Sequence, residues 1–214
     1  MRLLSVRSLA LCALALMSVT SFAGTIVGSA HDFSALGWNT SGQICKPCHV
    51  PHNAVVPQII PLWSHTTTAQ SGSYTIYTGP TGTMNAATGQ PAGVSLACLS
   101  CHDGTVNLDA FGGAAGTVTM GAIPANLGTN LSNDHPISFV YNAALATADG
   151  GLFNPTIALS GLGGTIEADL LYGAAGSKTL ECASCHDPHN GAGVAKLLRK
   201  SNAGSALCLT CHNK

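Results

Sequence analysis

The sequence predicts a mostly irregular chain with short helices and a few short β-hairpins, organised around bound prosthetic groups. Its 214 residues include 25 glycines, and aromatic residues make up only 5% of the chain. Side chains of this kind form a thin hydrophobic core. Four cysteine pairs recur, each followed at once by a histidine, and no other repeat period is visible. This argues against a solenoid or propeller.

Each cysteine pair has the pattern C-x-x-C-H, and we number these motifs 1 to 4 along the chain. Two thiols at this spacing can add to the two vinyl groups on one edge of a porphyrin, and the adjacent imidazole becomes the proximal ligand of its iron. The sequence therefore predicts four covalently attached haem c groups in a multihaem cytochrome c. The predicted attachment residues are Cys45, Cys48, Cys98, Cys101, Cys182, Cys185, Cys208 and Cys211, and the predicted proximal ligands are His49, His102, His186 and His212.

The first 23 residues have the layout of a secretory signal peptide. Arg2 and Arg7 give a positive start, residues 8–20 form a short apolar run, and Ser21-Phe22-Ala23 fits the small-residue cleavage pattern. No later stretch approaches the roughly 20 apolar residues of a membrane helix. We expect an exported protein, extracellular or at the cell surface, with the periplasm as the alternative. Residues 24–214 are expected to form a single tetrahaem domain.

Zinc is the main alternative ligand for paired cysteines, because two C-x-x-C pairs can make one four-thiolate site. Removing the signal peptide leaves eight of the nine cysteines, and all eight lie in the four motifs. Every pair is followed by histidine, which favours haem over zinc. No cysteine remains for a disulfide.

The charge of the chain is low. Loss of Arg2 and Arg7 with the signal peptide lowers the formal net charge from −1 to −3. Haem propionates would make the protein more acidic, which argues against nucleic acid or an anionic membrane as a partner.

An internal duplication is visible when the motifs are compared. Motif 1 reads CKPCHVPHN at residues 45–53 and motif 3 reads CASCHDPHN at residues 182–190, whereas motifs 2 and 4 lack the second histidine. Proline precedes that second histidine in both copies and limits helix continuation there. The pattern indicates two diverged dihaem modules, at about residues 24–110 and 150–214.

Four irons with four proximal histidines need four more axial ligands. Methionine could serve, but after the signal peptide the chain has only Met84 and Met120. Histidines are sufficient, so we predict bis-histidine, six-coordinate iron, in which no position is open for substrate. The chain is therefore expected to carry electrons and not to act as an enzyme. The candidate distal ligands, of which four are needed and one is idle, are His31, His52, His65, His135 and His189.

A few regular elements are expected between the motifs. Tyr74 to Thr78 predicts a hairpin strand before the turn Gly-Pro-Thr-Gly at residues 79–82. Residues 166–172 predict a short helix, and the basic stretch KLLRK at residues 196–200 also predicts helix.

The segments SAHDFS, CKPCHVPHN, PLWSH, LACLSCHDGTV, DHPISF, CASCHDPHN and LCLTCHNK together resemble the tetrahaem outer-surface cytochromes of the OmcE type. The resemblance covers essentially all of residues 24–214. It implies an extracellular homopolymer, a head-to-tail filament in which bis-histidine haems form one continuous stack and pass electrons to other cytochromes or extracellular acceptors. It also implies a distal histidine donated across the subunit boundary, and this position corresponds to His52.

Two other functions remain open at this point. A soluble periplasmic tetrahaem shuttle would use the same chemistry with all ligands inside one chain. A multihaem reductase would need one iron with an open axial position.

Overall fold

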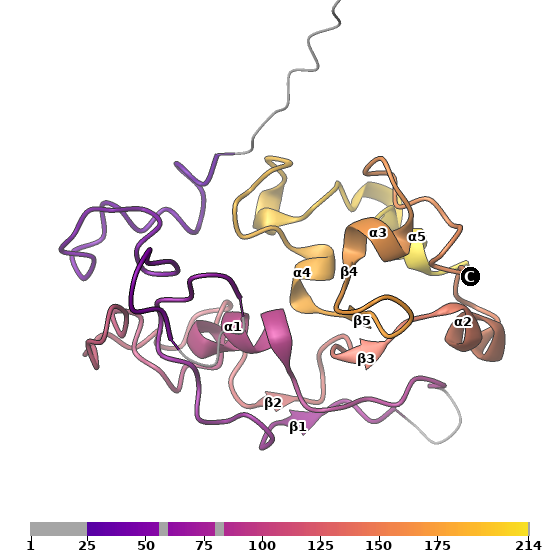
Figure 1. Cartoon of the computed structure of the whole chain (residues 1–214), viewed down its shortest axis with the longest axis horizontal. Coiled ribbons are helices and arrows are strands. Elements are labelled where there is room, and N and C mark those ends of the chain that lie inside the picture. The colour runs from indigo at the N-terminus through magenta and orange to yellow at the C-terminus, as the bar shows by residue number, and fades with distance from the viewer. Residues whose placement is uncertain (1–24, 56–59, 80–83, 214) are drawn as a thin grey trace, which may run out of the picture.

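The computed structural model describes residues 25–55, 60–79 and 84–213 (Figure 1), so the predicted signal peptide lies outside the described residues. Within these ranges the chain is mostly coil, and its longest helix, α1 (Gly93–His102), has 10 residues. The predicted class of short elements in a largely irregular chain is confirmed. The other elements are β1 (Thr75–Ile76), β2 (Asn130–Leu131), β3 (Phe139–Val140), α2 (Ala143–Asp149), α3 (Ile166–Leu170), β4 (Leu171–Tyr172), β5 (Thr179–Leu180), α4 (Cys182–Cys185), η1 (Ala195–Leu197), η2 (Ala203–Ser205) and α5 (Cys208–Cys211).

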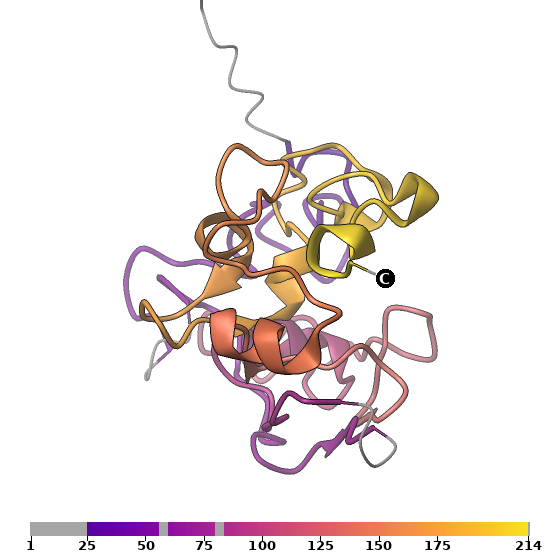
Figure 2. The same cartoon turned by 90° about the vertical axis from the view of Figure 1, so that its right-hand side faces the viewer.

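The four motifs are spread along the longest axis of the molecule. The segment 25–55, which includes motif 1, lies at one end, and α5 with motif 4 lies at the other (Figure 1). Between them, α1 and α4 pack against each other and carry motifs 2 and 3. Figure 2 faces the end that carries α2 and α5. No described helix is long and apolar enough to cross a bilayer.

Side chains cap the two α-helices of the described chain that lie outside the motifs, α2 and α3. The Asn142 side chain accepts a hydrogen bond from Leu145 N, and Thr165 accepts one from Ala168 N, so each satisfies an unpaired amide of a first turn. Gly150 ends α2 in the left-handed conformation (φ 68°). The helix predicted at residues 166–172 is two residues too long, because Leu171 and Tyr172 are extended and pair with β5.

Two small sheets connect distant parts of the chain. The strands β4 and β5 form an antiparallel hairpin, and β3 pairs with the other side of β5. The hairpin predicted around residues 74–78 is wrong: β1 pairs in parallel with β2, with Thr75 opposite Asn130. Residues 80–83 of its expected turn lie outside the described residues. A parallel pairing across this sequence separation leaves no local signal in the sequence.

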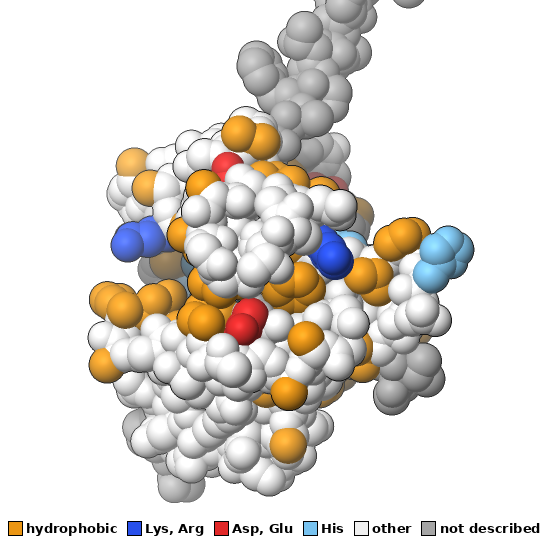
Figure 3. Space-filling view, turned by 90° about the vertical axis from the view of Figure 1, so that its left-hand side faces the viewer, with side chains coloured by type: hydrophobic (Ala, Val, Ile, Leu, Met, Phe, Trp, Pro, Cys, Tyr) orange, Lys and Arg blue, Asp and Glu red, His pale blue; other side chains and the backbone are white. Residues whose placement is uncertain are grey.

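The hydrophobic core consists of two small clusters, as expected from the scarcity of large apolar side chains. In the larger cluster α2 and α3 pack on the β3–β5–β4 sheet, and Met84 and Cys211 pack against its edge. In the smaller cluster, Leu96 and Leu99 of α1 cover β1 and β2. Hydrophobic side chains also remain exposed at the end that carries residues 25–55, among them Val27 and Leu36 (Figure 3).

The helix predicted at residues 196–200 is also wrong. Only η1 (Ala195–Leu197) is assigned there, and Lys196 and Leu197 have left-handed backbones with φ of 62° and 56°. Leu198 is extended. Such conformations stop an α-helix and reverse the chain.

Candidate haem attachment sites

Each C-x-x-C segment forms a single helical turn. In motif 1, His49 N donates to Cys45 O at 2.8 Å, and the same bond recurs from His186 N to Cys182 O at 3.0 Å. Motif 2 is the last turn of α1, and α5 contains both cysteines of motif 4. Residues three apart on a helical turn share one face, so both thiols of a motif can meet one porphyrin edge. After α4 and α5 the histidine itself is extended, which carries the imidazole away from the helix.

A returning stretch of chain runs beside every motif. In each case a backbone amide of this stretch donates to a carbonyl at or next to the motif histidine, which satisfies carbonyls that the short helical turn leaves unpaired. Ser64 N donates to Cys48 O, Leu127 N to His102 O, Arg199 N to Cys185 O and Phe153 N to Cys211 O, with N···O distances of 2.7–2.9 Å.

Three of the predicted proximal histidines are anchored in the same way. The Nδ1 atom of each ring lies within hydrogen-bonding distance of a backbone carbonyl oxygen in the returning stretch. The contacts are His49 to Pro61 O at 2.9 Å, His102 to Ala125 O at 2.7 Å and His186 to Lys196 O at 2.9 Å. Donation from Nδ1 fixes the tautomer and leaves the Nε2 lone pair for a metal.

Three pairs of histidine rings have the spacing that axial ligation needs. A metal–imidazole bond is about 2 Å long, so two imidazoles on opposite sides of one iron have ring centroids roughly 6 Å apart. The observed separations are 6.0 Å for His31–His102, 6.2 Å for His49–His189 and 6.3 Å for His135–His212. Each pair joins one motif histidine to one candidate distal ligand.

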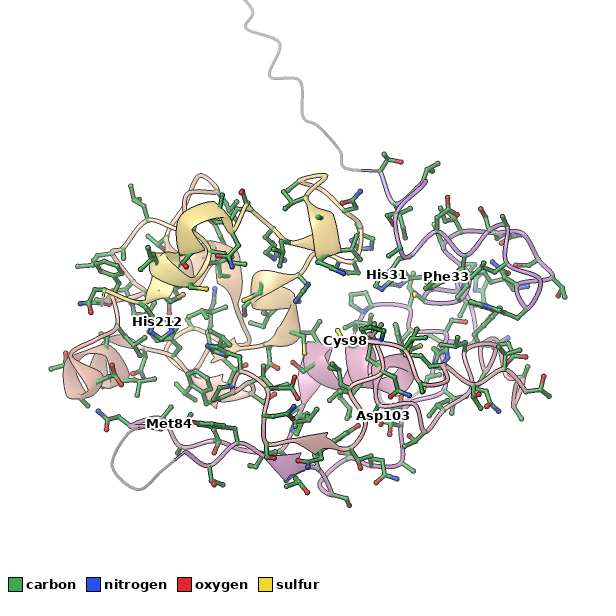
Figure 4. All side chains as sticks on the ribbon, turned by 180° about the vertical axis from the view of Figure 1, so that it is seen from behind. His31, Phe33, Met84, Cys98, Asp103 and His212 are labelled. Atoms are coloured by element: carbon green, nitrogen blue, oxygen red, sulfur yellow. The ribbon has the colours of Figure 1, made fainter. Side chains whose placement is uncertain are left out.

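His31 approaches His102 from the N-terminal segment. Figure 4 shows His31 beside Phe33, with Cys98 on α1 nearby. Burial, and next the neighbouring His102, lower the pKa of His31. A histidine must be neutral to bind a metal, so this environment favours the ligand form.

The remaining histidines fall outside these pairs. His65 is buried, and both of its ring nitrogens lie near backbone carbonyl oxygens, Thr66 O at 2.9 Å and Asn107 O at 3.0 Å. His52 is exposed at the surface. Among the described residues, no second histidine ring lies opposite His186, so motif 3 differs from the other three.

The thiols of successive motifs lie close to one another. Burial raises the pKa of Cys48 to about 11 and that of Cys101 to about 12, and in Cys101 the neighbouring Cys48 contributes next. A hydrogen bond between Cys98 and Cys182 raises the pKa of Cys98 and lowers that of Cys182. A zinc site would need several of these groups to converge, and the described part of the chain holds no group of three or more His, Cys, Asp and Glu placed to bind one metal ion.

The surroundings of motif 1 fit a haem in two further ways. The indole Nε1 of Trp63 is buried without a hydrogen-bond partner, and haem propionates are acceptors that could satisfy it. A hollow of about 350 Å³ borders the motif, lined by Gln43, Cys45, Lys46, His49, Val50, Pro51 and Leu62. Sequence analysis identified the motif residues but missed Trp63 as a donor and Pro61, Ala125 and Lys196 as acceptors, because a backbone carbonyl carries no residue-type signal.

Comparison with known proteins agrees with this chemistry. Residues 175–214, which contain motifs 3 and 4, match the family model described as a doubled CXXCH motif. No curated protein matches the chain. The family match indicates a multihaem c-type cytochrome, and the motifs imply covalently bound haem c.

Proposed function

We propose that this chain binds four haem c groups with bis-histidine ligation and carries electrons along them. The observation that carries this proposal is the set of three histidine pairs with ring centroids 6.0–6.3 Å apart. The proposed axial pairs are His102 with His31, His49 with His189, and His212 with His135. When bound, haem supplies a one-electron iron couple, and two histidine ligands leave no axial position for substrate.

The proposed axial pairs also place haems next to one another. His186 would bind the iron of motif 3 and His189, three residues further on, faces His49 of motif 1, so the haems of motifs 1 and 3 would be neighbours. The helices α1 and α4, which carry motifs 2 and 3, pack against each other. Electrons would pass between haems held close together in this way.

We further propose that His52 supplies the missing ligand opposite His186 of a second copy. The duplication supports this assignment, because motifs 1 and 3 are the two copies that carry a second histidine. In one chain, the extra histidine of motif 3 (His189) faces the iron site of motif 1. The equivalent extra histidine of motif 1, His52, would by the same rule serve motif 3, but across a subunit boundary.

Such a contact joins two different surfaces and does not close on itself, so it propagates as a filament. The proposal therefore includes export of the chain and assembly of an extracellular homopolymer, as the resemblance to OmcE-type cytochromes implies. Other cytochromes or extracellular acceptors would exchange electrons with its ends.

The open side of His186 also favours a second candidate function. If no second copy supplies a ligand, the iron at motif 3 is five-coordinate and could bind a small molecule, as in a multihaem reductase. A soluble periplasmic shuttle would instead need a ligand for this iron from the same chain.

Spectroscopy of the purified, haem-loaded protein over a range of concentrations separates the three functions. The filament predicts wholly low-spin iron and fibres by electron microscopy when concentrated, with one high-spin iron appearing on dilution. A shuttle predicts low-spin monomers at every concentration. A reductase predicts a high-spin iron at every concentration that binds nitrite or hydroxylamine. Monodisperse monomers at high concentration would exclude the filament.

A further inference from the structure

His65 occupies an unusual position for a histidine that binds no iron. Its side chain is buried, with only 1% of the residue exposed, and it lies between motifs 1 and 2. Its Nε2 atom is 3.0 Å from Asn107 O and 3.5 Å from the Sγ atom of Cys101, an attachment cysteine of motif 2. The ring is therefore in direct contact with the site where haem would be attached.

The neighbours of Nε2 determine which atoms carry protons. When Cys101 reacts with a vinyl group, sulfur bonds to one carbon and the thiol hydrogen passes to the other, so the thioether has no proton to donate. Afterwards Nε2 faces a carbonyl oxygen and a sulfur, both of which only accept hydrogen bonds. Nδ1 faces one acceptor, Thr66 O at 2.9 Å, and a neutral ring has a single hydrogen for its two nitrogens. The hydrogen meets two acceptors when it is on Nε2, and a nitrogen that carries a hydrogen has no lone pair for iron.

We propose that His65 is a positioning residue that donates its Nε2–H to Asn107 O and to the sulfur of Cys101, and that it does not bind iron. This proposal rests on the proposed function, because it concerns how a haem at motif 2 is held. It also accounts for the fifth histidine among the distal candidates, since His31, His52, His135 and His189 then supply the four ligands.

The backbone around His65 explains why the position matters for two haems. Ser64 N donates to Cys48 O of motif 1 at 2.9 Å. On the other side, Gly112 N donates to Ser64 O at 3.1 Å and Thr66 N donates to Ala110 O at 2.7 Å, in the loop that follows motif 2. The segment thus pairs with motif 1 and with the loop that follows motif 2, and the His65 ring fixes the Cys101 sulfur relative to this shared backbone.

Two substitutions test the role. His65→Leu fills the same space without a donor, whereas His65→Gln can place an amide N–H close to the position of Nε2. For each variant, covalent haem is counted by intact mass, unreacted Cys101 by alkylation of the unfolded protein and peptide mass analysis, and iron spin state by electron paramagnetic resonance. His31→Leu is the control for loss of a ligand.

We expect His65→Leu to keep its attached irons low-spin, to leave a larger fraction of Cys101 unreacted and to lower one of the reduction potentials. His65→Gln should restore both the attachment of Cys101 and the potential. A high-spin iron in both variants would show that His65 is a ligand and overturn the proposal. Unchanged attachment and potentials in His65→Leu would overturn the positioning role, as would equal defects in both variants. A low-spin spectrum in His31→Leu would instead count against the proposed axial pairs.

Discussion

The partner of each ring nitrogen distinguishes the roles of the histidines at the scale of single residues. In His49, His102 and His186, Nδ1 meets a backbone carbonyl and Nε2 is left for iron. In His65 both nitrogens meet carbonyls. Residue type alone makes these side chains equivalent, and the fold separates them.

Replacing His135 tests the axial pair at motif 4. The rings of His135 and His212 have centroids 6.3 Å apart, so His135→Ala should convert one iron from low spin to high spin while intact mass still shows four covalent haems. Asp134→Ala, at the adjacent position, is the control and should leave all four irons low-spin. A fully low-spin spectrum of His135→Ala would remove His135 from the ligand set.

The proposed distal ligand of motif 2, His31, should resist acid. Burial lowers the pKa of His31 below the ordinary value of 6.5, so a proton competes less well with iron for its nitrogen. The unfolded chain binds that proton more readily, which means the stabilisation is present above pH 6.5 and is lost as the pH falls below it. Spin state followed from about pH 7 to 4 should show this iron converting below pH 6.5. His31→Ala should be high-spin throughout, and conversion of this iron at or above pH 6.5 would contradict the assignment.

At the scale of elements, a buried carboxylate connects the parts of the chain that carry motifs 2 and 3. Glu181 precedes α4 and is buried. It accepts hydrogen bonds from the hydroxyls of Ser95 on α1, Ser138 at 2.7 Å and Thr179 at 2.6 Å. Ser95 Oγ in turn accepts a bond from Cys182 N at 2.9 Å. This network fixes α1 against α4.

Removing that carboxylate should destabilise the fold. Glu181→Leu removes the acceptor of the buried Ser95 hydroxyl and of the half-buried Ser138 hydroxyl, and should lower the free energy of unfolding by about 3 kcal/mol. Denaturant unfolding followed by far-ultraviolet circular dichroism measures the change. Glu167→Leu, which removes a carboxylate on α3 outside this network, should change the value by less than about 0.5 kcal/mol. Equal effects of the two substitutions would count against the network.

Some of these elements could be predicted from the sequence and others could not. The motif turns follow from C-x-x-C-H spacing, and the α3 start follows from the Thr165 cap. The returning stretches could not be predicted, because they act through backbone atoms far along the chain. Left-handed Lys196 is an example: its carbonyl meets His186 Nδ1, although Lys and Leu at residues 196–197 favour helix by composition. The pairing of His31 with His102 likewise depends on tertiary structure.

For the whole molecule, the proposed axial pairs would exchange ligands between the two predicted modules. His189 of the second module faces His49 of the first, and Asn190 Nδ2 donates to Thr25 O at 3.2 Å beside it. The two modules are therefore interlocked within one chain. The reciprocal ligand, His52, has no described ring opposite it, and His186 has none either. In the proposed filament a second copy would complete the exchange, and one unmet pair per chain would be sufficient for an open polymer.

The last prediction follows from that unmet pair. His52→Ala should keep four covalent haems but lose filaments, because the iron at motif 3 loses its ligand from the neighbouring copy. One iron should become high-spin at every protein concentration, and added imidazole should return it to low spin without restoring filaments, since imidazole is not tethered to a second chain. Electron microscopy and spin state measure the two effects. His65→Leu should retain filaments, and intact filaments from His52→Ala would remove His52 from the subunit contact.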